Sequence, residues 1–284
     1  MPNYPFRTAL GAVFLNFEPS GEAHLTVSSR PSIELPKPWS EAPIAVVVPT
    51  YNEADNLPRL ARRLFALKLP HLRLIVVDDG SPDGTGDIAD QLAAEVNEGR
   101  PGRMVVVHRK AKEGIGRAHL AGMAQALARD DQFIVQMDGD LSHQPETIPE
   151  MLGAMLATDS GLVIGSRYIA SGSLSESWTL YRRLLSRGGS AYVNSILHLR
   201  IADTTGGFKL WRADALKSID LARVRSSGFS FQIEMNYRAQ QAGAKILEIP
   251  IHFDERFAGK SKITLGIQLE GLWVPFALRA SRKR

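Results

Sequence analysis

The chain has 284 residues, of which 44% are hydrophobic and 23% charged, and it carries a formal net charge of +4. A chain of this size and composition can bury a sizeable core, which excludes a disordered tail and favours one α/β domain with additions. The absence of cysteine excludes disulfides, thiolate metal sites and a cysteine nucleophile. The N-terminus lacks a basic-then-apolar signal pattern, and no stretch reaches the roughly 20 apolar residues that span a bilayer. We therefore expect a protein made and kept in the cytoplasm.

Residues 1–42 contain scattered prolines and serines, and we expect them to form a loosely packed extension. The next part of the chain alternates short β-branched runs with helical patterns. Predicted strands cover residues 44–48, 74–77, 104–108 and 133–137, and predicted helices cover residues 57–67, 88–96 and 114–128. Side chains able to cap the first two helices stand before them: Asn52, Asp55 and Asn56, then Ser81, Asp83 and Thr85. This alternation predicts an open, mostly parallel twisted sheet with right-handed crossovers.

Acidic residues follow three of these strands at the point where each strand ends. The first strand runs into residues 49–53 (PTYNE), the second into Asp78-Asp79 and the fourth into Asp138-Gly139-Asp140. Because ligands of such sheets bind beyond the carboxyl ends of the strands, we expect these clusters to meet at one edge. Two carboxylates one residue apart can hold a divalent cation, which neutralises a diphosphate. The pattern favours a metal-dependent user of a nucleotide diphosphate, although such a pair can also cap a helix or form a polar turn.

Other nucleotide-binding classes lack their signatures in this chain. A dinucleotide site needs a glycine-rich turn after the first strand, and a P-loop needs Gly-x-x-x-x-Gly-Lys-Ser/Thr; neither occurs. A phosphoacceptor receiver domain also groups carboxylates at strand ends. Such a domain is much shorter, however, and this interpretation does not account for the arginine-rich second half of the chain.

The C-terminal segment concentrates the positive charge. Residues 255–284 carry seven Lys or Arg against two Glu, and residues 263–278 are largely apolar with one tryptophan. A basic, apolar segment of this kind favours an anionic membrane surface over nucleic acid, with the helix lying in the interface. Docking of the same helix on the domain is the alternative. We divide the chain accordingly into the extension 1–42, a domain 43–262 and an amphipathic basic segment 263–284.

Seven ordered motifs cover most of the chain: VVVPTYNE (46–53), VVDDGSPDGT (76–85), MDGDLSH (137–143), IGSRY (164–168), RRLLSRG (182–188), DTTGGFK (203–209) and GFSFQIEM (228–235). Their order resembles that of the inverting family 2 glycosyltransferases. The resemblance is greatest to the dolichol-phosphate (polyprenol-phosphate) mannose synthases of the short, hydrophilic type without transmembrane helices. It extends over about residues 44–270 and leaves out only the N-terminal extension and the last few residues.

The resemblance implies a GT-A fold, an α/β architecture with a Rossmann-like nucleotide-binding half and a C-terminal amphipathic helix. It implies transfer of mannose from GDP-mannose to a polyprenyl (dolichyl-type) monophosphate with inversion, and a requirement for Mg²⁺ or Mn²⁺. It also implies peripheral association with the cytoplasmic face of a membrane, in some relatives through a membrane-anchoring subunit, and no nucleic-acid partner. Two alternatives stay open: UDP-glucose or UDP-N-acetylglucosamine as the donor, and a non-catalytic binder of nucleotide sugars or anionic lipids.

The same resemblance assigns roles to individual residues. Asp138 and Asp140 would bind the metal. The catalytic set would be Asp140, Arg167, Arg182 and Arg256. The donor would be bound by Pro49, Tyr51, Glu53, Val77, Asp79, Asp138, Gly139, Asp140, Arg256 and Lys262. For Arg183, Arg187 and Arg200, a phosphate contact and a solvated surface position are equally compatible with the sequence.

Two residues of the MDGDLSH motif leave a question each. Ser142 stands where the family often has glutamine, so the third protein ligand of the metal is open and water can replace it. His143 fits either a base beside the metal or a structural hydrogen bond. A phosphate monoester has a second pKa near 6 and is largely dianionic at neutral pH, so the predicted nucleophile needs no strong general base.

Overall fold

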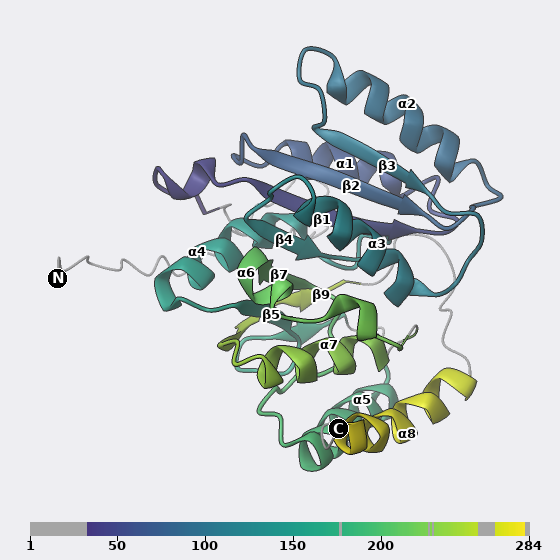
Figure 1. Ribbon diagram of the computed structural model, residues 1–284, viewed down its shortest axis with the longest axis vertical. Coiled ribbons are helices and arrows are strands. Elements are labelled where there is room, and N and C mark those ends of the chain that lie inside the picture. Colours follow the sequence, from purple (N-terminus) through teal and green to yellow (C-terminus); the bar gives the residue numbers. More distant parts are fainter. Residues whose placement is uncertain (1–32, 176–177, 227, 229, 255–264, 282–284) are drawn as a thin grey trace, which may run out of the picture.

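The computed structural model describes residues 33–175, 178–226, 228, 230–254 and 265–281, with only the backbone of 265–270 (Figure 1). Its centre is a seven-stranded sheet in the order β3-β2-β1-β4-β7-β5-β8. The strands are β1 (Ile44–Thr50), β2 (Leu72–Asp78), β3 (Met104–His108), β4 (Phe133–Gln136), β5 (Leu162–Ser166), β7 (Lys209–Arg212) and β8 (Ile246–Pro250). Only β7 runs antiparallel to its neighbours β4 and β5 in this sheet. The predicted mostly parallel sheet is confirmed.

The first two strands form because their residues are mostly β-branched and buried on both faces. Ile44 to Val48 are fully buried, as are Leu74 to Val77, which is the pattern of a parallel strand covered by helices. The observed strands match the predicted ones to within two residues at each end. β1 is two residues longer at its end, β2 is two residues longer at its start and one at its end, and β4 ends one residue earlier. Helices α1 (Leu57–Phe65), α2 (Thr85–Asn97) and α3 (Ile115–Leu127) connect them.

Helices cover both faces of the sheet and create two apolar cores. Side chains of α1, α2 and α4 (Ile148–Thr158) pack in one core. Side chains of α3, α5 (Leu180–Leu197), α6 (Ala213–Lys217) and α7 (Ser230–Gln241) pack in the other. Helix α3 lies so close to β1 that a Cβ on Gly122 would come within 2.3 Å of Cγ1 of Val47. A glycine at this position is what allows the helix to approach the sheet.

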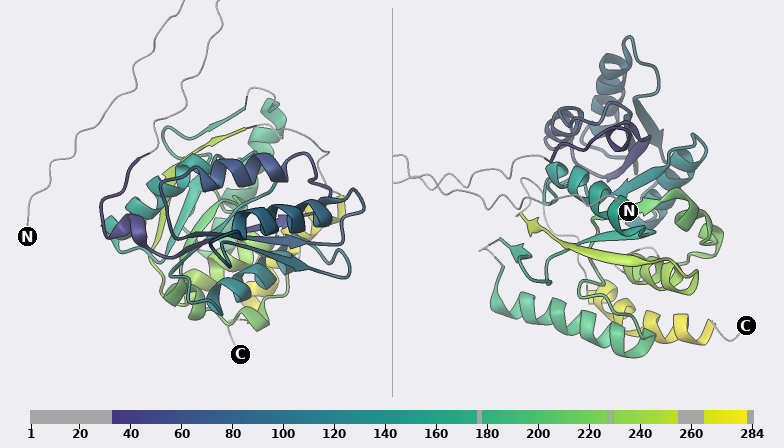
Figure 2. Two further views of the ribbon diagram at one scale, coloured as in Figure 1. Left: turned by 90° about the horizontal axis from the view of Figure 1, so that it is seen from above. Right: turned by 90° about the vertical axis from the view of Figure 1, so that its left-hand side faces the viewer.

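A last helix, α8 (Leu265–Ser281), lies beside α5 and α7 at the edge of the molecule (Figures 1 and 2). The Tyr192 hydroxyl donates a hydrogen bond to the carbonyl of Leu272 at 2.7 Å, which joins α5 to α8. Among the described helices, none combines the length and the apolar character needed to cross a membrane.

Short elements complete the described chain. A small two-stranded sheet pairs β6 (Ser173–Leu174) with β9 (His252–Phe253). The 3-10 helices are η1 (Trp39–Glu41), η2 (Pro145–Thr147) and η3 (Leu221–Arg223). Most of the predicted extension 1–42 lies outside the described residues, but Leu35 packs against the first core.

Candidate active site

The ends of β1 and β2 lie side by side and form one half of the acidic edge. Thr50 pairs with Asp78 in the parallel register. The Thr50 hydroxyl donates to Asp78 at 3.1 Å, and the Ser81 backbone N–H donates to the same carboxylate at 3.0 Å. Asp78 is 3% exposed. Its oxygens are therefore engaged in holding its own loop together, and we assign it a structural role.

Three consecutive backbone N–H groups tie the loop after β1 to the loop after β2. Asn52 donates to the Ser81 hydroxyl at 3.0 Å, Glu53 to the Thr85 hydroxyl at 2.9 Å and Ala54 to the Asp83 carboxylate at 3.1 Å. Asp83 also accepts from the hydroxyl and the N–H of Thr85. Burial opposes the change, but these hydrogen bonds, the one from the Thr85 hydroxyl above all, lower the pKa of Asp83. The SPDGT segment thus positions residues 51–54 at the sheet edge.

The predicted capping roles need correction at two helices. The residue before α2 is Gly84, with φ of +86°, a conformation that a glycine adopts without strain. At α1, Asn56 has helical dihedrals and its side chain caps no backbone N–H; its amide instead donates to the Glu53 carboxylate at 2.6 Å. Glu53 is therefore held in place by the start of the helix.

Asp79 and Tyr51 both meet cations from the loop after β3. Asp79 is 5% exposed and forms an ion pair with Arg109, which also pairs with Glu113. Burial raises the pKa of Asp79 above its ordinary value, and Arg109 opposes that rise. The ammonium of Lys112 lies 4.1 Å from the centre of the Tyr51 ring. Sequence analysis missed Arg109 and Lys112, since no motif marks residues 109–113.

The Asp138-Gly139-Asp140 segment lies against the loop after β1. A Cβ on Gly139 would come within 3.4 Å of the Pro49 carbonyl oxygen and 3.7 Å of Cγ of Glu53. Asp140 is 4% exposed, and one of its oxygens accepts hydrogen bonds from the Ser142 N–H at 3.1 Å and hydroxyl at 2.6 Å. Ser142 therefore orients Asp140. The strand ends that the sequence predicted to converge do meet at this edge.

His143 packs against the Asp138-Gly139-Asp140 segment from inside the protein. Its Nδ1 accepts a hydrogen bond from the backbone N–H of Asp138 at 3.2 Å, and its ring stacks on Phe208 with centroids 5.0 Å apart. The ring is 2% exposed. This geometry favours the structural alternative for His143 over a base beside a metal.

Asp138 and Asp140 are the two residues that the sequence predicted to hold a divalent cation. A Cβ on Gly207 would lie 3.5 Å from both carboxylate oxygens of Asp138, so a larger side chain there would fill the space beside the carboxylate. Within the part of the chain that the structure describes, three His, Asp or Glu side chains nowhere gather into a metal site. The two carboxylates suit a hard cation that takes its other oxygen ligands from a diphosphate and water.

Arg167, at the end of β5, forms a bidentate ion pair with Asp203. Its Nε and Nη2 donate to the two carboxylate oxygens at 2.7 Å each, and Nη2 also donates to Thr205 at 3.0 Å. Burial alone would lower the pKa of Arg167, but Asp203 and, less strongly, Asp138 raise it. In turn the pKa of Asp203 is lowered by Arg167 against the effect of burial. Asp203, which sequence analysis did not single out, thus fixes Arg167.

Aromatic rings hold the arginines on this side of the site. The Arg182 guanidinium lies 3.9 Å from the Trp178 ring centre, and that of Arg167 lies 5.7 Å from it. Trp178 is 9% exposed and packs edge-on against Phe253. We call Arg167, Arg182, Arg187, Tyr168 and Trp178 the arginine side, and Asp78, Asp79, Asp138 and Asp140 the carboxylate side.

The remaining predicted residues fall into two groups. Val77 is fully buried and packs against α3, so its side chain belongs to the core. Arg256 and Lys262 lie outside the described residues.

Lys209, in β7, is fully buried. Its ammonium donates to the Gln232 side chain at 2.8 Å and to the Gln232 carbonyl at 3.2 Å. Burial lowers the pKa of Lys209 to about 7.

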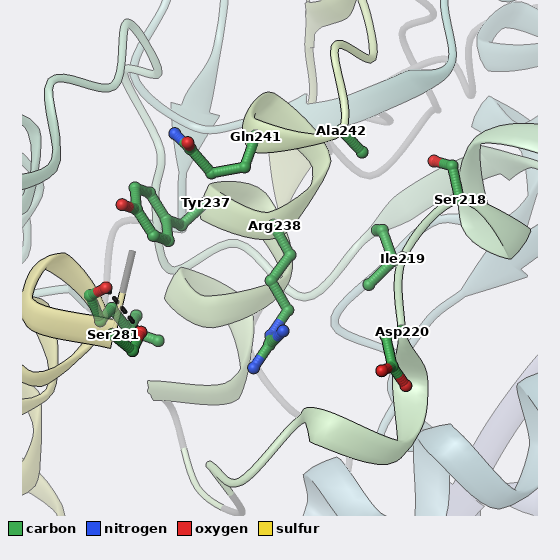
Figure 3. A pocket seen from close by; sticks show the side chains of 9 residues that line it. Ser218, Ile219, Asp220, Tyr237, Arg238, Gln241, Ala242 and Ser281 are labelled. Carbon is green, nitrogen blue, oxygen red and sulfur yellow. Dashed lines mark hydrogen bonds between the residues drawn. The ribbon is translucent and has the colours of Figure 1, made fainter. Parts of the chain in front are cut away.

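A separate cavity lies between α7, α8 and the segment 218–220 (Figure 3). It has a volume of about 330 Å³, and Tyr237, Arg238, Gln241 and Ser281 are among its lining residues. None of the residues predicted to bind the donor, metal or acceptor lines it. The candidate site is therefore the sheet edge.

Comparison with known proteins agrees with this geometry. The model of the family described as glycosyl transferase family 2 matches residues 45–220. The chain belongs to this family. As a family member it is a glycosyltransferase, and the predicted enzyme class is confirmed.

Two curated relatives are 42% identical to this glycosyltransferase. One is named undecaprenyl-phosphate mannosyltransferase, from Micrococcus luteus, and the match covers 79% of this chain and 88% of the relative. The other is named polyprenol monophosphomannose synthase, from Mycolicibacterium smegmatis, and the match covers 77% of this chain and 80% of the relative.

The fold is shared with a solved structure of more distant sequence. Glucosyl-3-phosphoglycerate synthase from Mycobacterium tuberculosis, in complex with Mn²⁺, UDP-glucose and phosphoglyceric acid, superposes with a TM-score of 0.60 at 18% identity. The match covers 84% of this chain and 80% of that one. The predicted GT-A fold is confirmed.

Proposed function

We propose that this glycosyltransferase moves mannose from GDP-mannose to a polyprenyl (dolichyl-type) monophosphate, with inversion at the sugar carbon. The products would be a polyprenyl phosphate β-D-mannose and GDP. The names of the two relatives at 42% identity support this choice of sugar and acceptor. The observation that carries it is that the Asp138 carboxylate and the Arg167–Asp203 ion pair meet at one sheet edge. Two adjacent glycines lie between them: a Cβ on Gly206 would be 3.3 Å from Cγ of Asp203, and one on Gly207 3.5 Å from both carboxylate oxygens of Asp138.

The carboxylate side would bind the donor. Asp138 and Asp140 would hold Mg²⁺ or Mn²⁺, which when bound neutralises the charge of the departing diphosphate. Tyr51 would offer its ring face to the base, in place of the Lys112 ammonium that contacts this face in the structure. Glu53 would accept hydrogen bonds from the nucleoside. Asp79 already pairs with Arg109, so it would act mainly by holding that loop.

The arginine side would bind the acceptor. Arg182 lies on the first turns of α5, where helix N–H groups add partial positive charge, and a guanidinium fork suits phosphate oxygens. Arg167 contributes its charge while Asp203 fixes its position. Arg256 and Lys262 remain proposed phosphate ligands on sequence grounds, because both lie outside the described residues.

The reaction would be a direct displacement. A dianionic acceptor oxygen attacks the sugar carbon from the face opposite the diphosphate, the C–O bond to the diphosphate breaks, and its electron pair leaves with GDP. No proton has to be removed from the nucleophile, so the protein's task is alignment and charge stabilisation. This fits His143 acting as a structural residue rather than a base.

A membrane surface would present the lipid acceptor. Helices α5 and α8 lie side by side (Figure 2). Both expose large apolar side chains: Leu180, Tyr181, Leu184 and Leu185 on α5, and Leu272, Trp273 and Phe276 on α8. The ring of Tyr192 in α5 contacts that of Phe276 in α8 with centroids 6.4 Å apart. Together with the basic C-terminus, these residues suit docking on the cytoplasmic face of an anionic membrane. A membrane-anchoring subunit would act at the same place.

The activity is tested with purified protein, a short polyprenyl phosphate and Mg²⁺ or Mn²⁺. GDP-mannose, UDP-glucose and UDP-N-acetylglucosamine are supplied in parallel, and transfer of sugar into the lipid phase is measured. Incorporation from GDP-mannose alone, abolished by EDTA, would support the proposal. Use of a UDP-sugar would keep the fold and the metal site but overturn the donor. Lack of transfer from any donor, with membranes added, would favour a non-catalytic binder.

A further inference from the structure

Three arginines that the sequence leaves ambiguous differ in the structure. The Nη2 of Arg183 donates to the Ser175 carbonyl at 3.2 Å, so this side chain braces the backbone before α5. Arg200 follows the end of α5 and is exposed. Arg187 instead lies against an aromatic ring, with its guanidinium carbon 5.5 Å from the ring centre of Tyr168. Of the three, Arg187 is the one held toward the candidate site.

Tyr168 links Arg187 to the rest of the arginine side. The guanidinium carbon of Arg167 lies 5.2 Å from the same Tyr168 ring. Arg167 in turn contacts Trp178, on which Arg182 also lies. Each outer arginine is thus joined to Arg167 through one shared ring, Arg187 through Tyr168 and Arg182 through Trp178. Arg187 follows Arg183 by one helical turn, and its side chain is exposed, so that a ligand can reach it from solvent.

Arg167 and Arg187 differ in the acidic partners that they have among the described residues. Asp203 balances Arg167, and it is fully buried. The α5 sequence contains no Asp or Glu, and among the described residues Arg187 forms no ion pair within 4.0 Å. An arginine that lies on a ring and forms no ion pair with a described residue is suited to an anion, because a guanidinium can bind two oxygens of one phosphate.

We propose that Arg187 binds the phosphate of the polyprenyl phosphate acceptor together with Arg182, and that the Tyr168 ring positions its guanidinium. This inference rests on the proposed function and adds a residue to its acceptor site. The acceptor rather than the donor diphosphate is the ligand because Leu184, three positions before Arg187, is 62% exposed. The phosphate group of the acceptor would contact Arg187, and its apolar chain would contact the exposed Leu184.

The experiment compares Arg187→Gln with Arg200→Gln, a matched control that removes the same charge from an exposed position beyond the other end of the helix. The substrates are GDP-mannose and farnesyl phosphate in solution, without vesicles. We expect Arg187→Gln to raise the KM for farnesyl phosphate at least tenfold and to change the KM for GDP-mannose by less than twofold. Arg187→Lys should recover part of the loss, and Arg200→Gln should match the wild type.

Other outcomes overturn the inference. An unchanged farnesyl phosphate KM in Arg187→Gln would do so, as would equal increases in both KM values, which indicate a general structural effect. Flotation with anionic phospholipid vesicles that lack polyprenyl phosphate separates the sources of phosphate: loss of vesicle binding with an unchanged KM would make Arg187 a headgroup contact. If the wild type transfers no sugar, the proposed function fails, and calorimetric titration of farnesyl phosphate into both variants still tests Arg187.

Discussion

The carboxylate side and the arginine side of the site are held in place by different means. Asp78 and Asp140 are almost fully buried and accept hydrogen bonds from backbone and hydroxyl groups of their own loops. Arg182 and Arg187 lie on ring faces of Trp178 and Tyr168, on an exposed part of α5. Hydrogen bonds in a buried loop fix atoms more rigidly than contacts to a ring face do. The difference suits a rigid, buried donor site beside an accessible acceptor site that admits a lipid.

The largest expected effect is on the carboxylate side. Asp140→Ala removes a proposed metal ligand, and we expect kcat to fall about 1,000-fold, since metal charge stabilisation contributes several kcal/mol. The Kd of Mn²⁺ in the presence of GDP should rise in parallel. Asp87→Ala, an exposed acidic residue of α2, is the control and should retain wild-type rates. An active Asp140→Ala enzyme would remove this aspartate from the metal site.

The next largest effect is expected at the Arg167–Asp203 ion pair, which fixes Arg167 on the arginine side. Arg167→Met leaves the Asp203 carboxylate buried without its partner, which should destabilise the protein by about 3–5 kcal/mol. Urea unfolding measures the loss. The double variant Arg167→Met/Asp203→Asn should recover much of the stability but not the activity. If the single variant is as stable as the wild type, the ion pair does not anchor Arg167.

A smaller effect is expected on the arginine side. Arg182→Gln should raise the KM for the polyprenyl phosphate about 10- to 100-fold, as a charge-assisted hydrogen bond contributes roughly 1.5–3 kcal/mol. The KM for GDP-mannose should stay near the wild-type value. Steady-state kinetics with each substrate varied in turn decide the matter. An increase confined to the donor KM would place Arg182 on the other side of the site.

The lowered pKa of Lys209 predicts that the free energy of unfolding depends on pH. This effect is separate from the two sides of the site. The pKa of Lys209 is lowered to about 7 in the fold, whereas an unfolded lysine titrates near pH 10.4. Between these values the unfolded chain binds more protons, so this group makes the free energy of unfolding rise with pH, by at most about 1.4 kcal/mol per pH unit. Lys209→Met should flatten the rise in urea unfolding between pH 7 and 9.5. Parallel pH curves for the two proteins would contradict this.

The smallest expected effect concerns Ser142. Its hydroxyl donates to Asp140, and the neighbouring N–H remains after substitution. Ser142→Ala should therefore lower kcat/KM only a few-fold, since one hydrogen bond contributes about 1 kcal/mol. A loss as large as that of Asp140→Ala would make Ser142 itself a ligand of the metal.

The sequence predicted the sheet and its acidic edge because β-branched runs and strand-end carboxylates are local signals. It could not predict partners supplied from distant positions. Asp203, which fixes Arg167, is 36 residues away, and Arg109, which pairs with Asp79, is 30 residues away. Ser81, Asp83 and Thr85 have the composition of a helix start, and α2 does begin at Thr85, but the fold also uses these three side chains to hold the loop after β1. The same side-chain oxygens can accept hydrogen bonds from the N–H groups of a helix start or from those of a neighbouring loop. The composition of the segment alone therefore does not distinguish the two roles.

The division into a donor side and an acceptor side is tested most directly by measuring two affinities in two variants. Calorimetry gives the affinity for GDP with Mn²⁺ and for farnesyl phosphate in Asp140→Ala and in Arg182→Gln. The account predicts that Asp140→Ala loses GDP binding and keeps farnesyl phosphate binding, and that Arg182→Gln does the reverse. Loss of both ligands in both variants would show a single, undivided site and would contradict it.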